Sequence, residues 1–359
     1  MAEKLDEKSI LDALQPSLTG LRPSKPALEA PLEAVAIEPS PLGVLAGFVS
    51  PNATGAITVW SGKGFNIVEL PNRNMMTPPS NPKFQVKLNA YREQLTFTRF
   101  AGDAPAPNRG NIQPDIDIRA IQYFQSIEDE SGGGIHAETG MWLLVPDPQL
   151  KGPPGEPMVA RLGVVPHGDA LLCQGFRIAH LSEKPPIFEV ADTTPFTLDA
   201  NGARINDTSA NYLQVIEATP RPPGITPQIV RDPNLLLAQH LAGTRVLEMD
   251  VLVISANPIA GIDGVDGVFQ QIGAKASIAN IPFVVNNANS NSMTCIFWLE
   301  RVRLQTGEEF RQLQYSQTVI LDFPVLAANG QPSGIKWPHV SVATLREPGA
   351  PALPLGAEG

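Results

Sequence analysis

The sequence predicts a mainly β protein, an antiparallel β-barrel with a long loop-rich insertion and one short helix. Three observations support this. Many stretches alternate apolar and polar residues, as strands with two different faces do. The 36 prolines and 30 glycines of the 359 residues supply turns between them. A single segment has clear helix start and stop signals.

The predicted strands begin after residue 41. Turn-forming stretches such as "PNRNMMTPPSNP", "SGGG" and "KGPPGEP" separate the first of them. "FQVKLNAYREQLTFTRF" is long enough for a hairpin or a bent strand. The strands before the insertion are, in order, "AITVW", "GFNIVEL", "FQVKLNAYREQLTFTRF", "DIDIRAIQYFQSIED", "IHAETGMWLLVP", "MVARLGVVP" and "ALLCQGFRIAH". Evenly spaced antiparallel strands of this kind favour a barrel or a sandwich.

The predicted helix lies in "RDPNLLLAQHLAG". Asp232 is its expected N-cap, Pro233 its first residue and Gly243 its end. Apolar residues cover most of its surface, so we expect it to pack on the barrel or on a partner subunit. It would then be either a lid over a cavity or a subunit contact. Strands resume with "RVLEMDVLVISA", "FQQIGAKASIA", "MTCIFWLERVRLQ", "FRQLQYSQTVILDF" and "WPHVSVATLR".

These elements predict one domain with two tails. Residues 1–40 form a proline-rich N-terminal tail, either a disordered leader or a strap, which limited proteolysis should cut first. Residues 41–346 form the elaborated barrel, with the insertion at about 181–293. Residues 347–359 form a C-terminal tail.

Composition excludes several classes of protein. The formal charge of -10 argues against a nucleic-acid surface. No apolar run approaches the roughly 20 residues of a membrane helix, and the N-terminus lacks a signal-peptide pattern, so we expect a cytoplasmic protein with no membrane partner. Cys173 and Cys295 are expected to be buried reduced thiols. The histidines have no zinc-ligand spacing.

Two strands carry candidate site residues. In "IHAETGMW", His136, Glu138 and Trp142 share one face. The His–Glu pair either points into a cavity or is a buried polar pair that fixes strand register, and both interpretations stay open. In "WPHVSVATLR", His339 shares a face with the small residues Ser341 and Ala343, which leaves room for something flat.

The remaining polar candidates favour structural roles. His180 and His240 are expected to be structural, and His167 is expected to cap a turn. Arg109 in "NRG" would be a carboxylate clamp or, as we slightly prefer, an arginine that organises a loop.

Three stretches together resemble a known family. "IHAETGMWLLVPDP", "MVARLGVVPHGDALLCQG" and "WPHVSVATLR" resemble the haem-binding β-barrels of the nitrobindin type, and above all their longer peroxidase-like haem-binding branch. These barrels are similar to the lipocalin and fatty-acid-binding-protein barrels. Their motifs are of the form "MHxExGxxR" and "HLxAxLxR", and here the Ala and Leu of the second stand one place later. The resemblance is loose over 41–180 and 294–346.

The resemblance implies a cofactor and a ligand. It makes His339 the proximal iron ligand of haem b and places His136 on or near the distal side. Glu138, Trp142, Ser341 and Ala343 would line the haem site. The iron would react with NO, peroxynitrite or peroxide, as in a weak haem peroxidase or a peroxynitrite isomerase. The partner would be a small-molecule or gaseous ligand, and a homo-oligomer is compatible with the sequence.

Two departures from the family and two rival functions remain. His167 stands where the compact family usually has Thr, and the insertion would reshape the pocket. The first rival is a haem-free barrel that carries a small apolar ligand. The second is a structural or assembly protein that uses the barrel as a scaffold.

Overall fold

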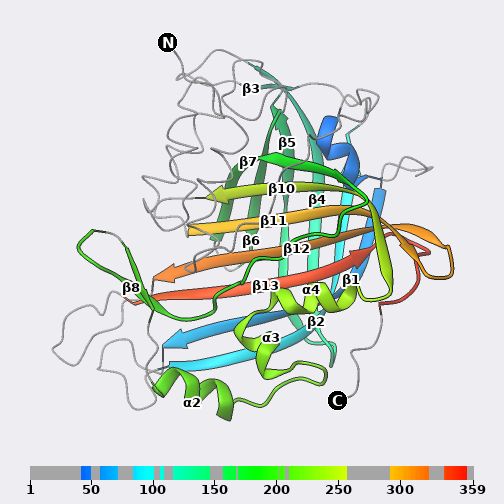
Figure 1. The fold of residues 1–359 in the computed structure, drawn as a ribbon. Coiled ribbons are helices and arrows are strands. Elements are labelled where there is room, and N and C mark those ends of the chain that lie inside the picture. The colour runs from blue at the N-terminus through cyan, green and yellow to red at the C-terminus, as the bar shows by residue number, and fades with distance from the viewer. Residues whose placement is uncertain are drawn as a thin grey trace.

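Ten strands pair in sequence order into a closed antiparallel β-barrel, as Figure 1 shows. This confirms the predicted fold class. The computed structural model describes residues 42–49, 57–71, 84–100, 106–108, 116–145, 157–166, 169–201, 203–206, 210–256, 292–322 and 335–353. The barrel strands are β1 (Ile57–Pro71), β2 (Phe84–Arg99), β4 (Ile116–Asp129), β5 (Gly134–Val145), β6 (Met158–Val165), β7 (Asp169–Ser182), β10 (Thr244–Ala256), β11 (Ser292–Leu304), β12 (Glu309–Asp322) and β13 (Lys336–Arg346).

The barrel closes between its first and last strands. β1 pairs with β13 from Ser61↔Arg346 to Ile67↔Val340. Gly64 lies opposite Ala343 in this pairing. A Cβ atom on Gly64 would lie 2.4 Å from ring atoms of Tyr91, so the glycine leaves the space that this ring occupies. Closure leaves neither strand with an unpaired edge along this stretch.

One end of the barrel is filled by a short 3-10 helix, η1 (Gly43–Phe48). The Phe48 ring lies inside the strands, 4.9 Å from the ring centroid of Phe97 and 4.8 Å from that of Trp142. Trp60 Nε1 donates a 2.9 Å hydrogen bond to the Phe48 carbonyl. We call this end the plugged end. Side chains alternate along a strand. Residues that stand two, four or six positions from Phe97 on β2, or from Trp142 on β5, therefore also face inward.

The outer wall carries a second apolar layer, which the insertion covers in part. Between β7 and β10 the chain forms β8 (Phe196–Leu198), β9 (Arg204–Asn206), α2 (Ala210–Ala218), α3 (Pro227–Arg231) and α4 (Asn234–His240). The short strand β3 (Ala106–Asn108) pairs with β4 outside the barrel path. Outward Val340 and Val342 of β13 belong to the same buried cluster as Ile229 and Leu237. In Figure 1 the helices lie beside β13, β1 and β2.

α4 is held on the outer wall by polar contacts as well as apolar ones. Gln314 Nε2 donates to the Leu237 carbonyl at 3.0 Å and to Thr344 Oγ1 at 2.8 Å. His240 Nδ1 lies 2.9 Å from the same hydroxyl oxygen. Burial lowers the pKa of His240 to about 4, with a smaller contribution from Arg346, so the imidazole that hydrogen-bonds Thr344 is neutral at pH 7. His240 is therefore structural, as predicted.

Several details of the predicted helix are wrong. The described part of the insertion contains three α-helices rather than one, and α4 begins after Pro233 rather than at it. Asp232 ends α3, and its carboxylate accepts the Asn234 backbone N–H at 3.2 Å. Gly243 has a φ of 78°, as expected of the residue that ends a helix. Because α4 lies against the side of β13, it packs on the barrel as predicted but is not a lid over a barrel end.

Replacing the shared hydroxyl should loosen this contact. In Thr344→Val, His240 Nδ1 loses its hydrogen-bond partner and Gln314 Nε2 loses one acceptor, both in a buried contact. We expect the free energy of unfolding to fall by about 1–3 kcal/mol, measured by urea denaturation. Thr96→Val, on the outer face of β2, should change it by less than about 0.5 kcal/mol. Equal small effects would mean that α4 is not docked as described.

The predicted domain boundaries differ in part from the structure. Residues 244–256, inside the predicted insertion, form barrel strand β10, because its apolar residues pair with both β7 and β11. At the C-terminus, Arg346 Nη1 donates to the carbonyls of Pro351 and Ala352, at 2.7 and 2.9 Å. The start of the predicted C-terminal tail therefore folds back on the barrel. Residues 1–40, Arg109, His167 and 257–291 lie outside the described residues.

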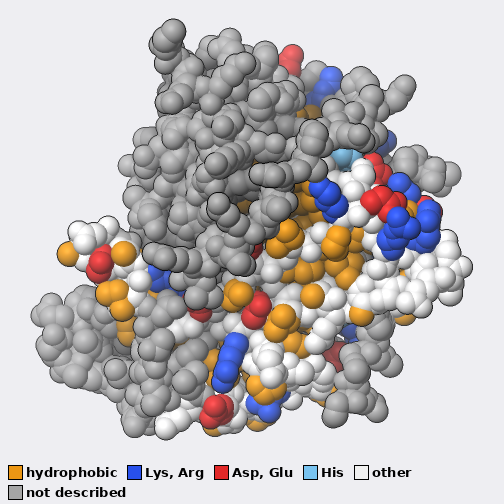
Figure 2. Space-filling view, viewed as in Figure 1, with side chains coloured by type: hydrophobic (Ala, Val, Ile, Leu, Met, Phe, Trp, Pro, Cys, Tyr) orange, Lys and Arg blue, Asp and Glu red, His pale blue; other side chains and the backbone are white. Residues whose placement is uncertain are grey.

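Charged side chains gather at one edge of the molecule. Figure 2 shows them at the right, where Figure 1 has the turn between β11 and β12. Arg301 contacts Glu248 at 3.3 Å and Glu309 at 2.9 Å. Such exposed pairs contribute about 0–1 kcal/mol each, so we regard this edge as ordinary solvated surface. No described helix has the length and apolar character needed to cross a membrane.

Candidate functional site

The inner wall changes from buried to partly exposed along the barrel. Trp60 and Trp142, at the plugged end, are fully buried. At the other end, where β5 begins and β10 ends, several inward-facing side chains keep contact with solvent, although Ala256 and Met293 there are buried. We call this the accessible end. The partly exposed inward side chains there are Asn89, His136, Leu171, Gln317, Val319, His339 and Ser341. A molecule entering the barrel would meet these residues first.

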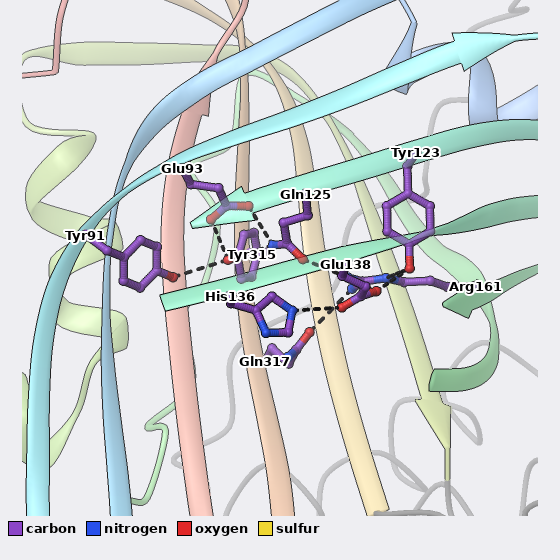
Figure 3. A network of polar contacts seen from close by, with 9 residues as sticks. All are labelled: Tyr91, Glu93, Tyr123, Gln125, His136, Glu138, Arg161, Tyr315 and Gln317. Carbon is purple, nitrogen blue, oxygen red and sulfur yellow. Dashed lines mark hydrogen bonds and ion pairs between the residues drawn. The ribbon is translucent and has the colours of Figure 1, made fainter. Parts of the chain in front are cut away.

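A buried polar network crosses the barrel between the two ends (Figure 3). One half of it contains Glu138, from β5, and Arg161, from β6. Arg161 Nη2 donates to Glu138 Oε1 at 2.8 Å, and the Tyr123 hydroxyl donates to the same oxygen. Glu138 Oε2 lies 3.3 Å from His136 Nε2. Glu138 is 5% exposed and the His136 side chain 26%, so the pair links the buried network to the accessible end.

Arg161 keeps Glu138 ionised. Burial by itself raises the pKa of Glu138, but the Arg161 charge and the hydrogen bonds from His136 and Tyr123 outweigh it. The result is a pKa of about 2. Because the guanidinium is also buried, the two charges depend on each other.

The other half of the network contains a second carboxyl group, Glu93 from β2. Gln125 Nε2 donates to Glu93 Oε1 and the Tyr315 hydroxyl to Glu93 Oε2, each at 2.7 Å. The Tyr91 and Tyr315 hydroxyls are 3.2 Å apart. Burial raises the pKa of Glu93 to about 7, although the hydrogen bonds from Tyr315 and Gln125 lower it.

Arg161 joins the two halves. Its Nη2 donates to Gln125 Oε1 at 3.3 Å, and Gln125 in turn donates to Glu93. Its Nη1 donates to Gln317 Oε1 at 3.4 Å. The inner wall thus holds two carboxyl groups with widely separated pKa values, one ionised and one partly protonated at neutral pH. Such separation is typical of functional sites, although structural networks also produce it.

The raised pKa of Glu93 should make stability depend on pH. The unfolded carboxyl ionises near pH 4.5 and the folded one near pH 7, so the folded state binds the proton more tightly. Stability should therefore fall as pH rises from about 4.5 to 7, by an amount on the order of 3 kcal/mol from this group. Glu93→Gln should remove this part of the pH dependence, measured by urea denaturation at pH 5 and pH 8.

Exposed Glu128→Gln provides the control for this experiment. It should keep the wild-type difference in unfolding free energy between the two pH values. Other titrating groups cancel when each variant is compared with the wild type. An unchanged pH difference in Glu93→Gln would show that Glu93 titrates normally in the folded protein.

The structure brings His136 and Glu138 together, as their shared face predicted, and both face the barrel interior. Trp142 shares that face but packs against Phe48 and Phe297 at the plugged end. It belongs to the sealed core rather than to the accessible part of the wall. The two cysteines are buried and free, as predicted.

His339, Ser341 and Ala343 also face inward, but the space beside them differs from the expectation. Ala343 is fully buried, and the Tyr91 ring lies against its partner Gly64. The Tyr91 ring therefore occupies the space beside Ala343 where a flat ligand was expected. His339 Nε2 donates to the Glu69 carbonyl at 2.8 Å, and burial lowers the pKa of the imidazole. Ser341 keeps partial exposure.

Apart from His136 and Glu138, the network residues were missed in the sequence. Tyr91 and Glu93 stand two apart in "FQVKLNAYREQLTFTRF", and Tyr123 and Gln125 do so in "IRAIQYFQSIED". Polar residues recurring at period two on one face of a long strand were the available signal. That signal could not separate an inner polar face from an ordinary solvent-exposed one.

His180 has the structural role that was predicted. Its Nδ1 lies 2.8 Å from Asp250 Oδ1, a contact that raises the pKa of the imidazole. Arg177 Nη1 donates to the same carboxylate oxygen at 3.1 Å. These contacts join β7 to β10.

Within the described residues, no group of three or more His, Cys, Asp or Glu side chains is arranged to hold a metal ion. No protein-family model, curated protein or solved structure matches this chain. The resemblance to nitrobindin-type barrels therefore stays a prediction.

Proposed function

We propose that this protein is a β-barrel that binds a small molecule inside its accessible end. The main support for this proposal is the change in burial along the inner wall. Aromatic side chains seal one end, whereas polar side chains at the other end reach solvent. Barrel mouths are common small-molecule sites. The network of Glu93, Arg161 and Glu138 would form the floor beneath the ligand.

The side chains of the accessible wall indicate a ligand more polar than the small apolar one that the haem-free alternative assumed. Its partly exposed groups include the Gln317 amide N–H groups and the Ser341 hydroxyl, which a purely apolar ligand would bury without hydrogen bonds. Leu171 and Val319 also face this space and belong to the apolar layer of the interior. These residues favour an amphipathic molecule.

Blocking the inner wall tests the binding function. The neutral dye Nile red should bind the full-length protein and become fluorescent, and native mass spectrometry should detect any ligand retained through purification. Ser341→Trp places a large side chain on the accessible wall and should abolish dye binding. Gln94→Trp, exposed on the outer face of β2, should leave it unchanged. If the two variants bind the dye alike, the dye does not enter the barrel and the proposal fails.

Haem is the second candidate ligand, because burial keeps His339 neutral, the form that coordinates iron. Two contacts in the barrel limit the space in which haem could bind near His339. Nε2 already donates to the Glu69 carbonyl, and Tyr91 occupies the space beside Ala343. A porphyrin does not fit there, so we propose haem only for the space beyond Ser341, toward the accessible end. Bound haem would supply an iron that reacts with NO, peroxynitrite or peroxide.

A haem titration separates the candidates. If haem is the ligand, the wild type should give a Soret band with about one equivalent of haem. His339→Ala should lose that band or bind far more weakly. Tight binding by His339→Ala would show that His339 is not the axial ligand. A colourless wild type that still binds Nile red would favour the haem-free barrel.

A further inference from the structure

Four polar side chains form a continuous row on the accessible inner wall. Gln317 on β12 is the direct partner of Ser341 on β13, which is the partner of Asn66 on β1, which is the partner of Asn89 on β2. Side chains at directly opposed positions of antiparallel strands have Cβ atoms about 4.5–5.5 Å apart. The row therefore crosses four adjacent strands, including the seam where the barrel closes.

Neighbouring contacts fix which atoms the row presents. A guanidinium can only donate, so the Gln317 atom facing Arg161 is the amide oxygen, and Nε2 is left as a donor. Asn89 Nδ2 donates to Asn66 Oδ1 at 2.6 Å, which leaves Asn66 Nδ2 as a donor. Within the described part of the chain, neither these two groups nor the Ser341 hydroxyl donates to a protein atom. We call Gln317, Ser341 and Asn66 the donor row.

An apolar strip lies on the neighbouring part of the same wall. Ala256 on β10 pairs with Met293 on β11, and Met293 pairs with Val319 on β12. Val319 stands two residues from Gln317 on one strand, so the strip and the donor row adjoin. Ala256 and Met293 are buried, so a molecule beside the donor row would meet hydrocarbon at Val319, the partly exposed member of the strip.

The charges of the wall favour a neutral acceptor over an anion. Arg161 is paired with Glu138 at 2.8 Å, and Glu93 is the next carboxyl group of the network. A ligand carboxylate beside the donor row would lie near these two acidic groups. A neutral carbonyl oxygen would accept from the same donors without burying a charge.

Resting on the proposed binding function, we propose that the donor row binds the carbonyl oxygen of a neutral amphipathic ligand, a ketone or an ester. The alkyl part of the ligand lies against Val319, the partly exposed residue of the apolar strip. The ligand is thus selected by hydrogen bonds from amide and hydroxyl groups rather than by a charged anchor.

A matched probe pair tests the ligand class. 2-Decanone and decanoate have the same carbon number and differ in carrying a neutral carbonyl or a carboxylate. At pH 8, 2-decanone should displace Nile red from the wild type at a concentration at least about tenfold lower than decanoate, because decanoate would bury a negative charge near Glu138 and Glu93. Equal or tighter binding of decanoate, or dye binding that 2-decanone cannot displace, would overturn the inference while leaving the binding barrel intact.

Two variants assign the binding to the donor row. Gln317→Glu keeps an oxygen for Arg161 but replaces the free amide donor with an acceptor, so ketone binding should weaken about tenfold. Ser341→Ala, a smaller change, should weaken it several-fold. Gln122→Glu, exposed on the outer face of β4, is the control and should bind normally. Thermal midpoints near that of the wild type would establish that the variants are folded.

The outcomes distinguish the two proposals. Normal ketone binding by folded Gln317→Glu and Ser341→Ala contradicts the donor row. If Gln317→Glu does not fold, Ser341→Ala decides alone. If the wild type binds neither dye nor probe, the binding function fails, and this inference with it.

Discussion

Arg161→Met should be among the most destabilising single substitutions in this protein, lowering the free energy of unfolding by about 3–5 kcal/mol at pH 7. The methionine fills much of the same volume but leaves the Glu138 carboxylate buried without its cation. Gln125 and Gln317 also lose a donor to their side-chain oxygens. Urea denaturation at pH 7 measures the loss.

The pH dependence identifies the cause of that loss. Without Arg161, the pKa of Glu138 should rise above its unfolded value, because burial is no longer offset. The folded variant then binds a proton more tightly than the unfolded chain, so its deficit relative to the wild type should shrink as pH falls toward 4. Adding Glu138→Gln should recover part of the stability at pH 7.

Arg303→Met is the matched control, since Arg303 forms an exposed pair with Glu309. Its loss should stay within about 1 kcal/mol. An Arg161→Met protein no less stable than this control would show that the network contributes little to the fold. A deficit that does not change with pH would point to lost packing rather than to a stranded carboxylate.

Phe48→Ala should cost about 3–5 kcal/mol, because it empties the centre of the plugged end. The ring is fully buried and packs against Phe97, Trp142 and Phe297. Neighbouring side chains come from different strands of a closed barrel, so they can move only partly into the space. Chemical denaturation and the thermal midpoint measure the effect.

Phe124→Ala controls for the loss of an aromatic side chain. Phe124 is 49% exposed on the outer wall, and its removal should change stability by less than about 0.5 kcal/mol. Similar losses for the two variants would mean that η1 is not part of the cooperative core. Because the plug is far from the accessible end, Nile red should still bind the folded fraction of Phe48→Ala.

Much of the fold could be predicted from local patterns. Most strands between "AITVW" and "WPHVSVATLR" could be placed, because alternation and turn residues act over a few positions. However, "AITVW" and "GFNIVEL" form the single strand β1, and "FQQIGAKASIA" lies outside the described residues. The insertion was harder to delimit. Its start was placed well, but β10 was included in it, since the pairing of β10 with β7 joins strands separated by 61 intervening residues, 183–243, that leave the barrel.

Only part of the candidate site could be predicted from the sequence. His136 and Glu138 stand two apart on one strand, so their shared face follows from the period of a strand alone. The role of the small residues beside His339 could not be predicted from the strand period. Room beside Ala343 could be inferred from β13, but its occupant, Tyr91, comes from β2, two strands away.

The sequence by itself determined which side chains share a strand face, where most turns divide the strands, and that the segment of α4 is helical. Each of these depends on backbone geometry over a few residues. Only the tertiary structure decided which faces turn inward and which residues meet there. Gln125 reaches Glu93 across 32 positions, and Tyr315 reaches it across 222, because register and closure bring their strands together. Both carboxyl groups are buried there, and burial raises the pKa of each. The direct ion pair between Arg161 and Glu138 is what sets the pKa of Glu138 apart from that of Glu93.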